Sequence, residues 1–295
     1  MFRTLLFVLT NLAIVVVLGI VMRLLGLDGY LTSEGLNYEA LLIFCFAFGM
    51  VGAFISLLLS KFMAKKATGT TLIENPRTQQ EIFLVTTVEE IARSAGIGMP
   101  DVGIFPANEA NAFATGANRN KALVAISSGM LERYSPSEIK AVLAHEVSHV
   151  ANGDMITMVL LQGVINTFVM FFARVIGFVV DRAILKNEGG RGVGFVVTTI
   201  FCEIVLGLLA SIITMWFSRR REYKADEGAA RLAGAPAMVA ALAHLQRESE
   251  MSTEGLPQSL NAFGINGQKG SALKALFMSH PPLEKRIEAL RNFVD

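Results

Sequence analysis

The five residues His145-Glu146-Val147-Ser148-His149 decide how this chain is interpreted. Residues four apart lie on one face of an α-helix, so both imidazoles can reach one metal ion. Glu146 lies beside them, where its carboxylate can contact a water molecule on that metal. Two histidines and a glutamate at this spacing are typical of zinc hydrolases. The alternative is an ordinary helix with two surface histidines, but two of only 4 histidines in the chain fall here, which disfavours chance.

The flanking sequence predicts that the motif lies within a helix. Ser135 can cap that helix, Pro136 suits its first position and Glu138 completes a capping box. Asn152-Gly153 supplies a C-terminal stop. Apolar residues recur between these ends at helical spacing and predict a buried face: Ile139, Val142, Leu143, Val147 and Val150.

Composition predicts a membrane protein. Hydrophobic residues make up 53% of the chain and charged residues 17%, and the mean hydropathy is +0.50. A soluble domain carries about 25% charged residues. Four apolar runs account for the difference, and each has roughly the 20 residues that a helix needs to cross a bilayer. These runs are residues 4–22, 38–60, 155–180 and 193–217.

The apolar runs differ in purity. We expect the first to be a retained anchor, because no small-x-small cleavage site follows it. Asn166 and Arg174 interrupt the third run, and Glu203 lies in the fourth. Polar groups inside a span are costly and usually face protein or water. A hairpin that enters the bilayer only in part therefore remains an alternative for residues 155–217.

Loop charges predict the orientation. The loop 27–37 carries Asp28 and Glu34 and no Lys or Arg, whereas basic residues precede the first run and follow the second and fourth. The positive-inside rule places both termini and the segments 61–154 and 218–295 in the cytoplasm. The basic residues are Arg3, Lys61, Lys65, Lys66, Arg219, Arg220, Arg221 and Lys224.

These signals divide the chain into four segments. Residues 1–60 form a transmembrane hairpin, and residues 61–154 form the first part of a cytoplasmic domain, which contains the metal motif. Residues 155–217 form a second hydrophobic hairpin, and residues 218–295 complete the cytoplasmic domain. A hairpin brings its two ends together, so residues on either side of 155–217 can be neighbours in space.

That proximity predicts a third metal ligand. A catalytic zinc needs three protein ligands and one open position. We assign Glu222 as the third ligand, and Asp226, one helical turn later, as the group that holds the free ring nitrogen of a zinc-bound histidine. His244 and His280 are the rival third ligands. The alternative is a solvated helix on which both carboxylates pair with neighbouring arginines.

The motif His145-Glu146-Val147-Ser148-His149, followed by Glu222-Tyr223-Lys224-Ala225-Asp226, resembles the gluzincin membrane peptidases, a family that includes HtpX and the CAAX prenyl endopeptidases. The similarity to the HtpX type covers nearly the whole chain, including residues 111–116, residues 279–282 and Arg286. It implies a mainly α membrane protein with four hydrophobic helices and a cytoplasmic α+β zincin-like domain, which has a small β-sheet and carries the motif on its active-site helix.

The resemblance also implies a function. We expect a multi-pass zinc endopeptidase of the bacterial inner membrane, with its active site and both termini facing the cytoplasm, that degrades misfolded or damaged membrane proteins under stress. One Zn²⁺ per chain would be held by His145, His149 and Glu222, with Glu146 as the general base. Expected partners are membrane-protein or unfolded-protein substrates, the lipid bilayer and other quality-control proteases. The net charge of +1 does not favour nucleic acid.

Three alternative functions remain open. They are a CAAX-type prenyl endopeptidase, an intramembrane zinc protease, and a non-catalytic membrane adaptor that keeps zinc for structure. The metal motif lies outside the apolar runs, which disfavours the intramembrane protease.

Two further sites follow from the resemblance. Residues 102–105, 111–114 and 122–126 read as strands, and in the family the second of these pairs with substrate. The residues expected to bind substrate are Asn111, Ala112, Phe113 and Ala114. His280 and Arg286 are expected to approach the active site and stabilise the oxyanion. The plainer alternatives are an ordinary edge strand and a His-Pro-Pro sequence that only starts the last helix.

The remaining sequence predicts scaffold. We expect one helix from Asn75-Pro76 to about Ala95 and another over residues 236–246, with His244 as a structural residue. Residues 249–271 are rich in Gly, Ser, Asn and Gln and predict a loop.

Overall fold

A computed structural model describes residues 37–187, 192–254, 278 and 280–293. The chain divides into two compact units. The first comprises Met1–Ser56 and Thr157–Thr214, and the second comprises Leu57–Ile156 and Met215–Asp295. The first predicted hydrophobic run, residues 4–22, lies outside the described residues.

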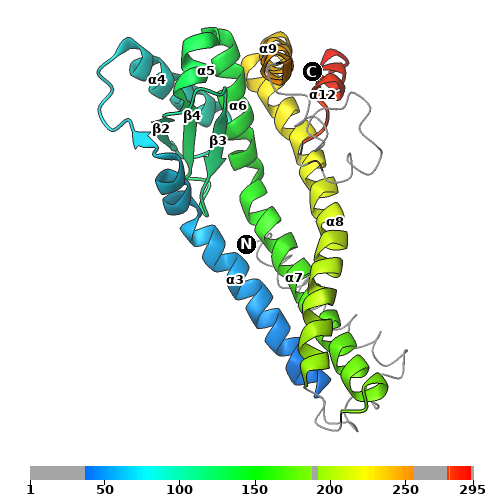
Figure 1. Cartoon of the computed structure of the whole chain (residues 1–295). Helices are drawn as coiled ribbons and strands as arrows, with labels where there is room; N and C mark the ends of the chain where they lie inside the picture. Colours follow the sequence, from blue (N-terminus) through cyan, green and yellow to red (C-terminus); the bar gives the residue numbers. More distant parts are fainter. Residues whose placement is uncertain (1–36, 188–191, 255–277, 279, 294–295) are drawn as a thin grey trace. The chain divides into compact units, whose positions relative to one another are not determined.

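Long apolar helices make up the first unit (Figure 1). They belong to α3 (Tyr38–Thr68), α7 (Asp154–Val179), which continues as the short π-helix Val180–Ile184, and α8 (Val193–Ala233). Within the described residues, these three helices are long and apolar enough to cross a membrane. They confirm three of the four predicted hydrophobic helices. Both α3 and α8 continue beyond the apolar runs that predicted them, to Thr68 and Ala233.

Small residues and paired charges shape the packing of the first unit. A Cβ atom added at Gly49 of α3 would lie 2.8 Å from the carbonyl oxygen of Gly163 in α7, so only glycine allows this approach. The Arg174 guanidinium donates to the Glu203 carboxylate at 2.8 Å. The charges that interrupt the third and fourth runs therefore pair with each other. This pairing lowers the cost of placing a charged side chain in an apolar helix.

The second unit contains a four-stranded mixed sheet in the order β1-β2-β4-β3 (Figure 1). Strands β2 (Asp101–Phe105) and β4 (Leu123–Ser127) are parallel, and β3 (Ala112–Thr115) pairs antiparallel with β4 at the edge. The three predicted strands are confirmed. The fourth, β1 (Thr71–Leu72), was not predicted, because two residues are too few to show an alternating pattern.

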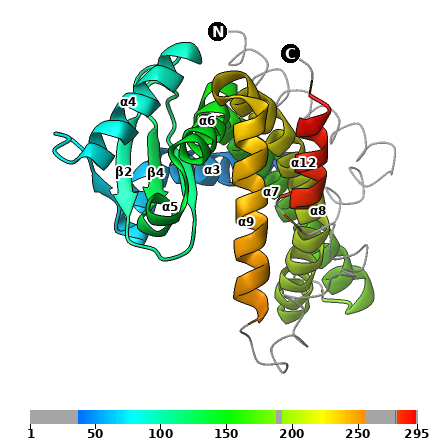
Figure 2. The ribbon, with the colours of Figure 1, turned by 90° about the horizontal axis from the view of Figure 1, so that it is seen from above.

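Helix α6 (Pro136–Asn152) packs against the sheet on one side and against α9 (Ala235–Glu254) on the other (Figure 2). Among the described residues, the other helices of this unit are α4 (Gln79–Ser94), α5 (Ser128–Arg133) and α12 (Leu283–Arg291). One hydrophobic core joins α4, the sheet, α6 and α9, and its fully or nearly fully buried members include Leu84, Val124, Leu143, Val147 and Met238.

The ends of α6 follow the sequence prediction. The Ser135 side chain accepts from the main-chain N–H of Glu138, and the Glu138 carboxylate accepts from that of Ser135, so the capping box is complete. Gly153 ends the helix in the left-handed conformation, with φ of 70°. The metal motif is therefore held in a helix with both ends satisfied.

Two boundary predictions were wrong. Helix α4 begins after Thr78 instead of at Asn75-Pro76, because Thr78 forms a capping box with Glu81 that the sequence analysis overlooked. Helix α9 runs on to Glu254, through the first residues of the predicted loop 249–271. The rest of that loop lies outside the described residues.

Candidate metal centre

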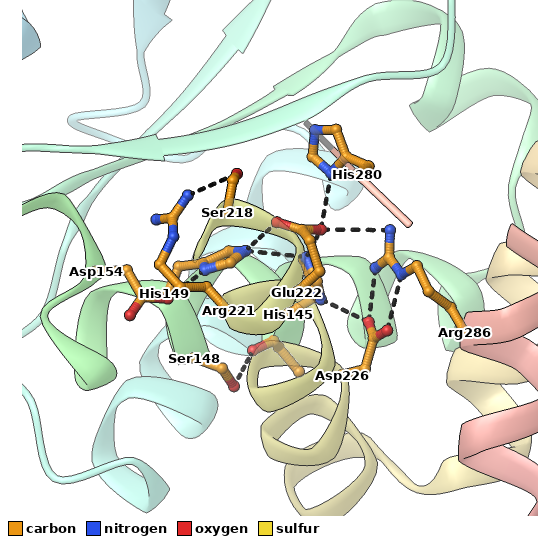
Figure 3. Close-up of polar contacts among 11 residues, drawn as sticks. His145, Ser148, His149, Asp154, Ser218, Arg221, Glu222, Asp226, His280 and Arg286 are labelled. Atoms are coloured by element: carbon orange, nitrogen blue, oxygen red, sulfur yellow. Dashed lines mark hydrogen bonds and ion pairs between the residues drawn. The ribbon is translucent and has the colours of Figure 1, made fainter. Parts of the chain in front are cut away.

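Two imidazoles and a carboxylate converge in the second unit (Figure 3). His145 and His149 come from α6 and Glu222 comes from α8. The two Nε2 atoms lie 3.2 Å apart. Glu222 places Oε2 3.5 Å from Nε2 of His145 and Oε1 3.3 Å from Nε2 of His149. One donor atom from each residue lies within 4.8 Å of the others, so this group can hold a metal ion.

The donor set fits zinc chemistry. Two histidines and a glutamate are one of the ligand sets of catalytic zinc, and they leave a position for water or substrate. Glu222 is only 2% exposed. Burying a carboxylate beside two imidazoles is costly unless a proton or a cation balances the charge. The sequence predicted these three residues, and the fold brings them together.

A glycine allows α8 to approach α6. A Cβ atom added at Gly228 would lie 2.4 Å from Oγ and 2.7 Å from Cβ of Ser148. Ser148 lies within the His-Glu-x-x-His motif and donates its hydroxyl back to the Ala144 carbonyl. The two helices are thus in backbone-level contact one to two turns from Glu222, which is how a residue 73 positions after His149 reaches it.

The His145 ring is held from behind by a carboxylate. Its Nδ1 lies 2.9 Å from Oδ1 of Asp226, which leaves Nε2 to face Glu222. Asp226 also accepts two bonds from Arg286, from Nε at 2.8 Å and from Nη2 at 2.6 Å. Arg286 in turn lies 3.4 Å from Oε2 of Glu222. The side chain of Arg286 thus joins the two carboxylates of α8 to α12.

The His149 ring is held by a residue that the sequence analysis missed. Its Nδ1 lies 2.6 Å from Oδ2 of Asp154, the first residue of α7 (Figure 3). Asp154 is 6% exposed. The available signal was an acidic residue directly after the Asn152-Gly153 stop, five residues beyond His149.

These contacts change the protonation of both histidines. Burial by itself would lower the pKa of His149, but hydrogen bonds with Asp154 and Glu222 outweigh it and raise the pKa to about 9. For His145, burial is likewise outweighed, by hydrogen bonds with Asp226 and Glu222, and its pKa is also raised. Positive charge beside the surrounding carboxylates is therefore favoured. A divalent cation could supply that charge, because metal-bound histidine is neutral.

Glu146 follows His145 on α6 and interacts electrostatically with both imidazoles. Burial raises its pKa above the ordinary value for glutamate, although both imidazoles act in the opposite direction. The main-chain N–H of Ala114 also donates to it. A carboxylate with a raised pKa is better suited to accept and later release a proton near neutral pH.

Strand β3 presents an edge next to Glu146. The main-chain N–H of Ser127 in β4 donates to the Asn111 carbonyl, and pairing alternates along an antiparallel strand. The main-chain groups of Ala112 and Ala114 therefore point away from β4, whereas Phe113 pairs with it. Asn111 precedes the strand and is exposed. Of the predicted substrate-binding residues, Ala114 thus contacts Glu146 of the metal motif.

The three remaining candidate residues, His280, Arg286 and His244, differ in their distance from the metal-ligand group and in their burial. His280 is 63% exposed at its side chain, and its Nδ1 lies 2.8 Å from Oε2 of Glu222. Arg286 is buried on two carboxylates. His244 contacts Glu138 near the opposite end of α6, at 3.2 Å, and stacks on Tyr134. It therefore lies apart from the metal-ligand group.

The fold and this site define a metallopeptidase whose chain also carries membrane-length helices. The chain belongs to peptidase family M48, whose model matches residues 77–294. It is 61% identical to "Protease HtpX" of Pseudomonas paraeruginosa (strain DSM 24068 / PA7) over 291 residues, which covers 99% of each chain. It is 60% identical to "Protease HtpX" of Pseudomonas fluorescens (strain SBW25) over 294 residues, again 99% of each. We conclude that the chain is a membrane metalloprotease.

A solved structure shares the fold. The crystal structure of Ste24p from S. mikatae matches with a TM-score of 0.64 and 19% sequence identity. The match covers 98% of this chain and 67% of that one. The similarity supports the architecture described here.

Proposed function

We propose that this metalloprotease is a zinc-dependent endopeptidase of the bacterial inner membrane, with one Zn²⁺ held by His145, His149 and Glu222. The observation that carries the proposal is the convergence of these three side chains from α6 and α8. A zinc ion held there would act as a Lewis acid toward a peptide carbonyl and toward water.

Glu146 is the proposed general base. Its carboxylate accepts a proton from the attacking water and delivers it to the leaving amine. Its interactions with both imidazoles and with the main-chain N–H of Ala114 in β3 support this role, because a peptide lying on the edge of β3 would pass beside it. The raised pKa makes this carboxylate a stronger proton acceptor.

Substrate is proposed to bind as an added strand along Asn111–Ala114. The outward main-chain groups of Ala112 and the outward carbonyl of Ala114 can pair with any extended peptide, whatever its side chains, whereas the Ala114 N–H donates to Glu146. Such pairing suits an enzyme that acts on many unfolded segments. We therefore propose misfolded or damaged membrane proteins as the substrate class.

His280 and Arg286 are proposed to act differently from each other. The exposed His280 lies over Glu222 and can meet a developing oxyanion. Arg286 is buried against Asp226 and Glu222, so we propose that it positions these carboxylates. This revises the oxyanion role that the sequence analysis assigned to it.

The proposed topology has four transmembrane helices, with the active site and both termini in the cytoplasm. Support comes from the basic residues after the apolar part of α3 and within α8, beyond its apolar part. The proposed domain division, 1–60, 61–154, 155–217 and 218–295, places the metal-ligand group in the cytoplasmic segments.

The test is Glu146→Gln, measured in detergent against an unfolded membrane-protein substrate. The variant should keep its zinc and lose about 10²–10⁴-fold in peptidase rate, because only the proton acceptor has gone. Glu227→Gln, a change at an exposed glutamate of α8, is the matched control and should keep the wild-type rate. A Glu146→Gln enzyme with wild-type rate would overturn the assignment.

A further inference from the structure

Asp154 makes the closest polar contact of either histidine in the metal-ligand group, 2.6 Å from Nδ1 of His149. We infer that Asp154 is a positioning residue for the metal: its carboxylate fixes the His149 ring so that Nε2 faces Glu222, and it strengthens Nε2 as a ligand. The inference rests on the proposed zinc site and adds to it a residue from the start of α7.

The orientation of the His149 ring is the first observation that supports this role of Asp154. An imidazole has two nitrogens, and either can bind metal unless a partner fixes one of them. With Nδ1 on Asp154, Nε2 of His149 lies 3.2 Å from Nε2 of His145 and 3.3 Å from Glu222. A ring turned over would direct Nδ1 to that place instead. The Asp154 contact therefore selects the ring orientation that completes the group.

The burial of Asp154 is the second observation that supports this role. The residue is 6% exposed, and a buried carboxylate is costly unless it is hydrogen-bonded. Its contact with His149 offsets that cost and adds negative charge behind the ring. A carboxylate partner of this kind raises the basicity of the opposite nitrogen and typically contributes 10–100-fold to metal affinity.

The main-chain turn at Gly153 is the third observation that supports this role. Gly153 adopts φ of 70°, a left-handed conformation that brings the chain back toward the last turn of α6. Its N–H bonds to the carbonyls of His149 and Val150. Asp154 then opens α7 with its carboxylate against His149, so one tight turn sets both the helix end and the ligand.

The two histidines are therefore held by different parts of the fold. Asp226, behind His145, lies far along the chain and shares its charge with Arg286. Asp154, behind His149, belongs to the helix that leads into the first unit. We expect the position of the first turn of α7 to affect the affinity for zinc.

The experiment compares wild type, Asp154→Asn and Asp154→Ala as full chains in detergent. Zinc Kd is measured by competition with a chromophoric chelator. We expect about 10-fold weaker binding for Asp154→Asn, which keeps the shape but loses the charge, and up to about 100-fold for Asp154→Ala. The visible spectrum of the Co²⁺-loaded protein should change in the alanine variant, because its ring is no longer fixed.

Controls separate the possible failures. Asp101→Asn, a change at an exposed acidic residue of β2, should keep the wild-type Kd. Thermal unfolding with chelator present shows whether each variant is folded at the assay temperature; the Asp154 variants should lose some stability there, because the contact with His149 is lost. If wild type binds no zinc, the proposed metal site itself fails. If wild type binds zinc and Asp154→Asn binds equally well, only the role of Asp154 is overturned, and this holds even where the alanine variant does not fold.

Discussion

The two ends of α6 carry similar pairs with different chemistry. Near its start, His244 contacts Glu138 at 3.2 Å; near its end, His149 contacts Asp154 at 2.6 Å. Arg133 bonds the other carboxylate near His244, that of Glu248, at 2.5 Å, and Glu138 belongs to the helix cap. The charges at the start of α6 are therefore already balanced.

At the end of α6 the carboxylates outnumber the permanent cations. Asp154, Glu222, Asp226 and Glu146 lie about the two imidazoles, and Arg286 is the one guanidinium that the described contacts place on them. A histidine–carboxylate pair alone therefore does not define a metal site. A metal site also needs the free ring nitrogens to converge on further carboxylates whose charge is not fully balanced by permanent cations.

Removing the central carboxylate should have the largest effect. Glu222→Ala should abolish zinc binding and peptidase activity together, because two imidazoles alone make an incomplete site. Metal content after dialysis and substrate cleavage are the measurements. His244→Ala, at the balanced end of α6, should keep both properties. Full zinc occupancy in Glu222→Ala would show that another residue is the third ligand.

Separating α8 from α6 should have an intermediate effect. Gly228→Ala places a methyl group within 2.7 Å of two atoms of Ser148 and should destabilise the chain by about 1–3 kcal/mol. Zinc affinity should fall as well, because Glu222 moves with α8. Thermal unfolding and zinc Kd are the measurements.

A second substitution tests whether the clash with Ser148 causes these losses. Adding Ser148→Gly removes the clashing side chain and should restore part of the zinc affinity. Gly207→Ala, at a position of α8 with nothing within 4 Å of the added Cβ, should leave the zinc Kd unchanged and should not lower the stability, because alanine favours a helix more than glycine does. A Gly228→Ala protein with wild-type stability and Kd would rule out close approach as the device that delivers Glu222.

Changes at the start of α6 should have the smallest effect. Burial raises the pKa of Glu138, but hydrogen bonds from the main chain and hydroxyl of Ser135 outweigh it and hold the pKa below its ordinary value. A lowered pKa means that the charge contributes stability above the unfolded-state pKa, about 4.3, and that this stability disappears as the pH falls through the folded-state pKa.

Glu138→Gln should therefore lower the unfolding free energy by about 0.3–1 kcal/mol at neutral pH, the usual contribution of an acidic side chain to a helix start. The difference from wild type should vanish on acidification. Thermal unfolding over a pH series measures it, with zinc content unchanged throughout. A difference that persists under strongly acidic conditions would show that the charge is not its source.

Local sequence determined most of α6 and its metal-binding face. Capping residues, helical spacing and the glycine stop act over a few residues, so Ser135, Glu138 and Gly153 fixed the helix and set His145 and His149 one turn apart. The three longer strands and three apolar helices followed from equally local patterns. Glu222 was predictable only because residues 155–217 were expected to form a hairpin, and the two ends of a hairpin lie close together.

The sequence predicted Asp226 behind a histidine, but only the tertiary structure decided its partner and the other contacts around the ligands. Asp154 reaches His149 through a left-handed turn, Arg286 joins Asp226 from a separate helix, and Gly228 meets Ser148 where two helices touch. These contacts depend on positions in space that no periodicity encodes. A sequence pattern states which face a residue occupies, whereas the approach of α8 to α6 and the reach of Arg286 from α12 decide which charges meet there.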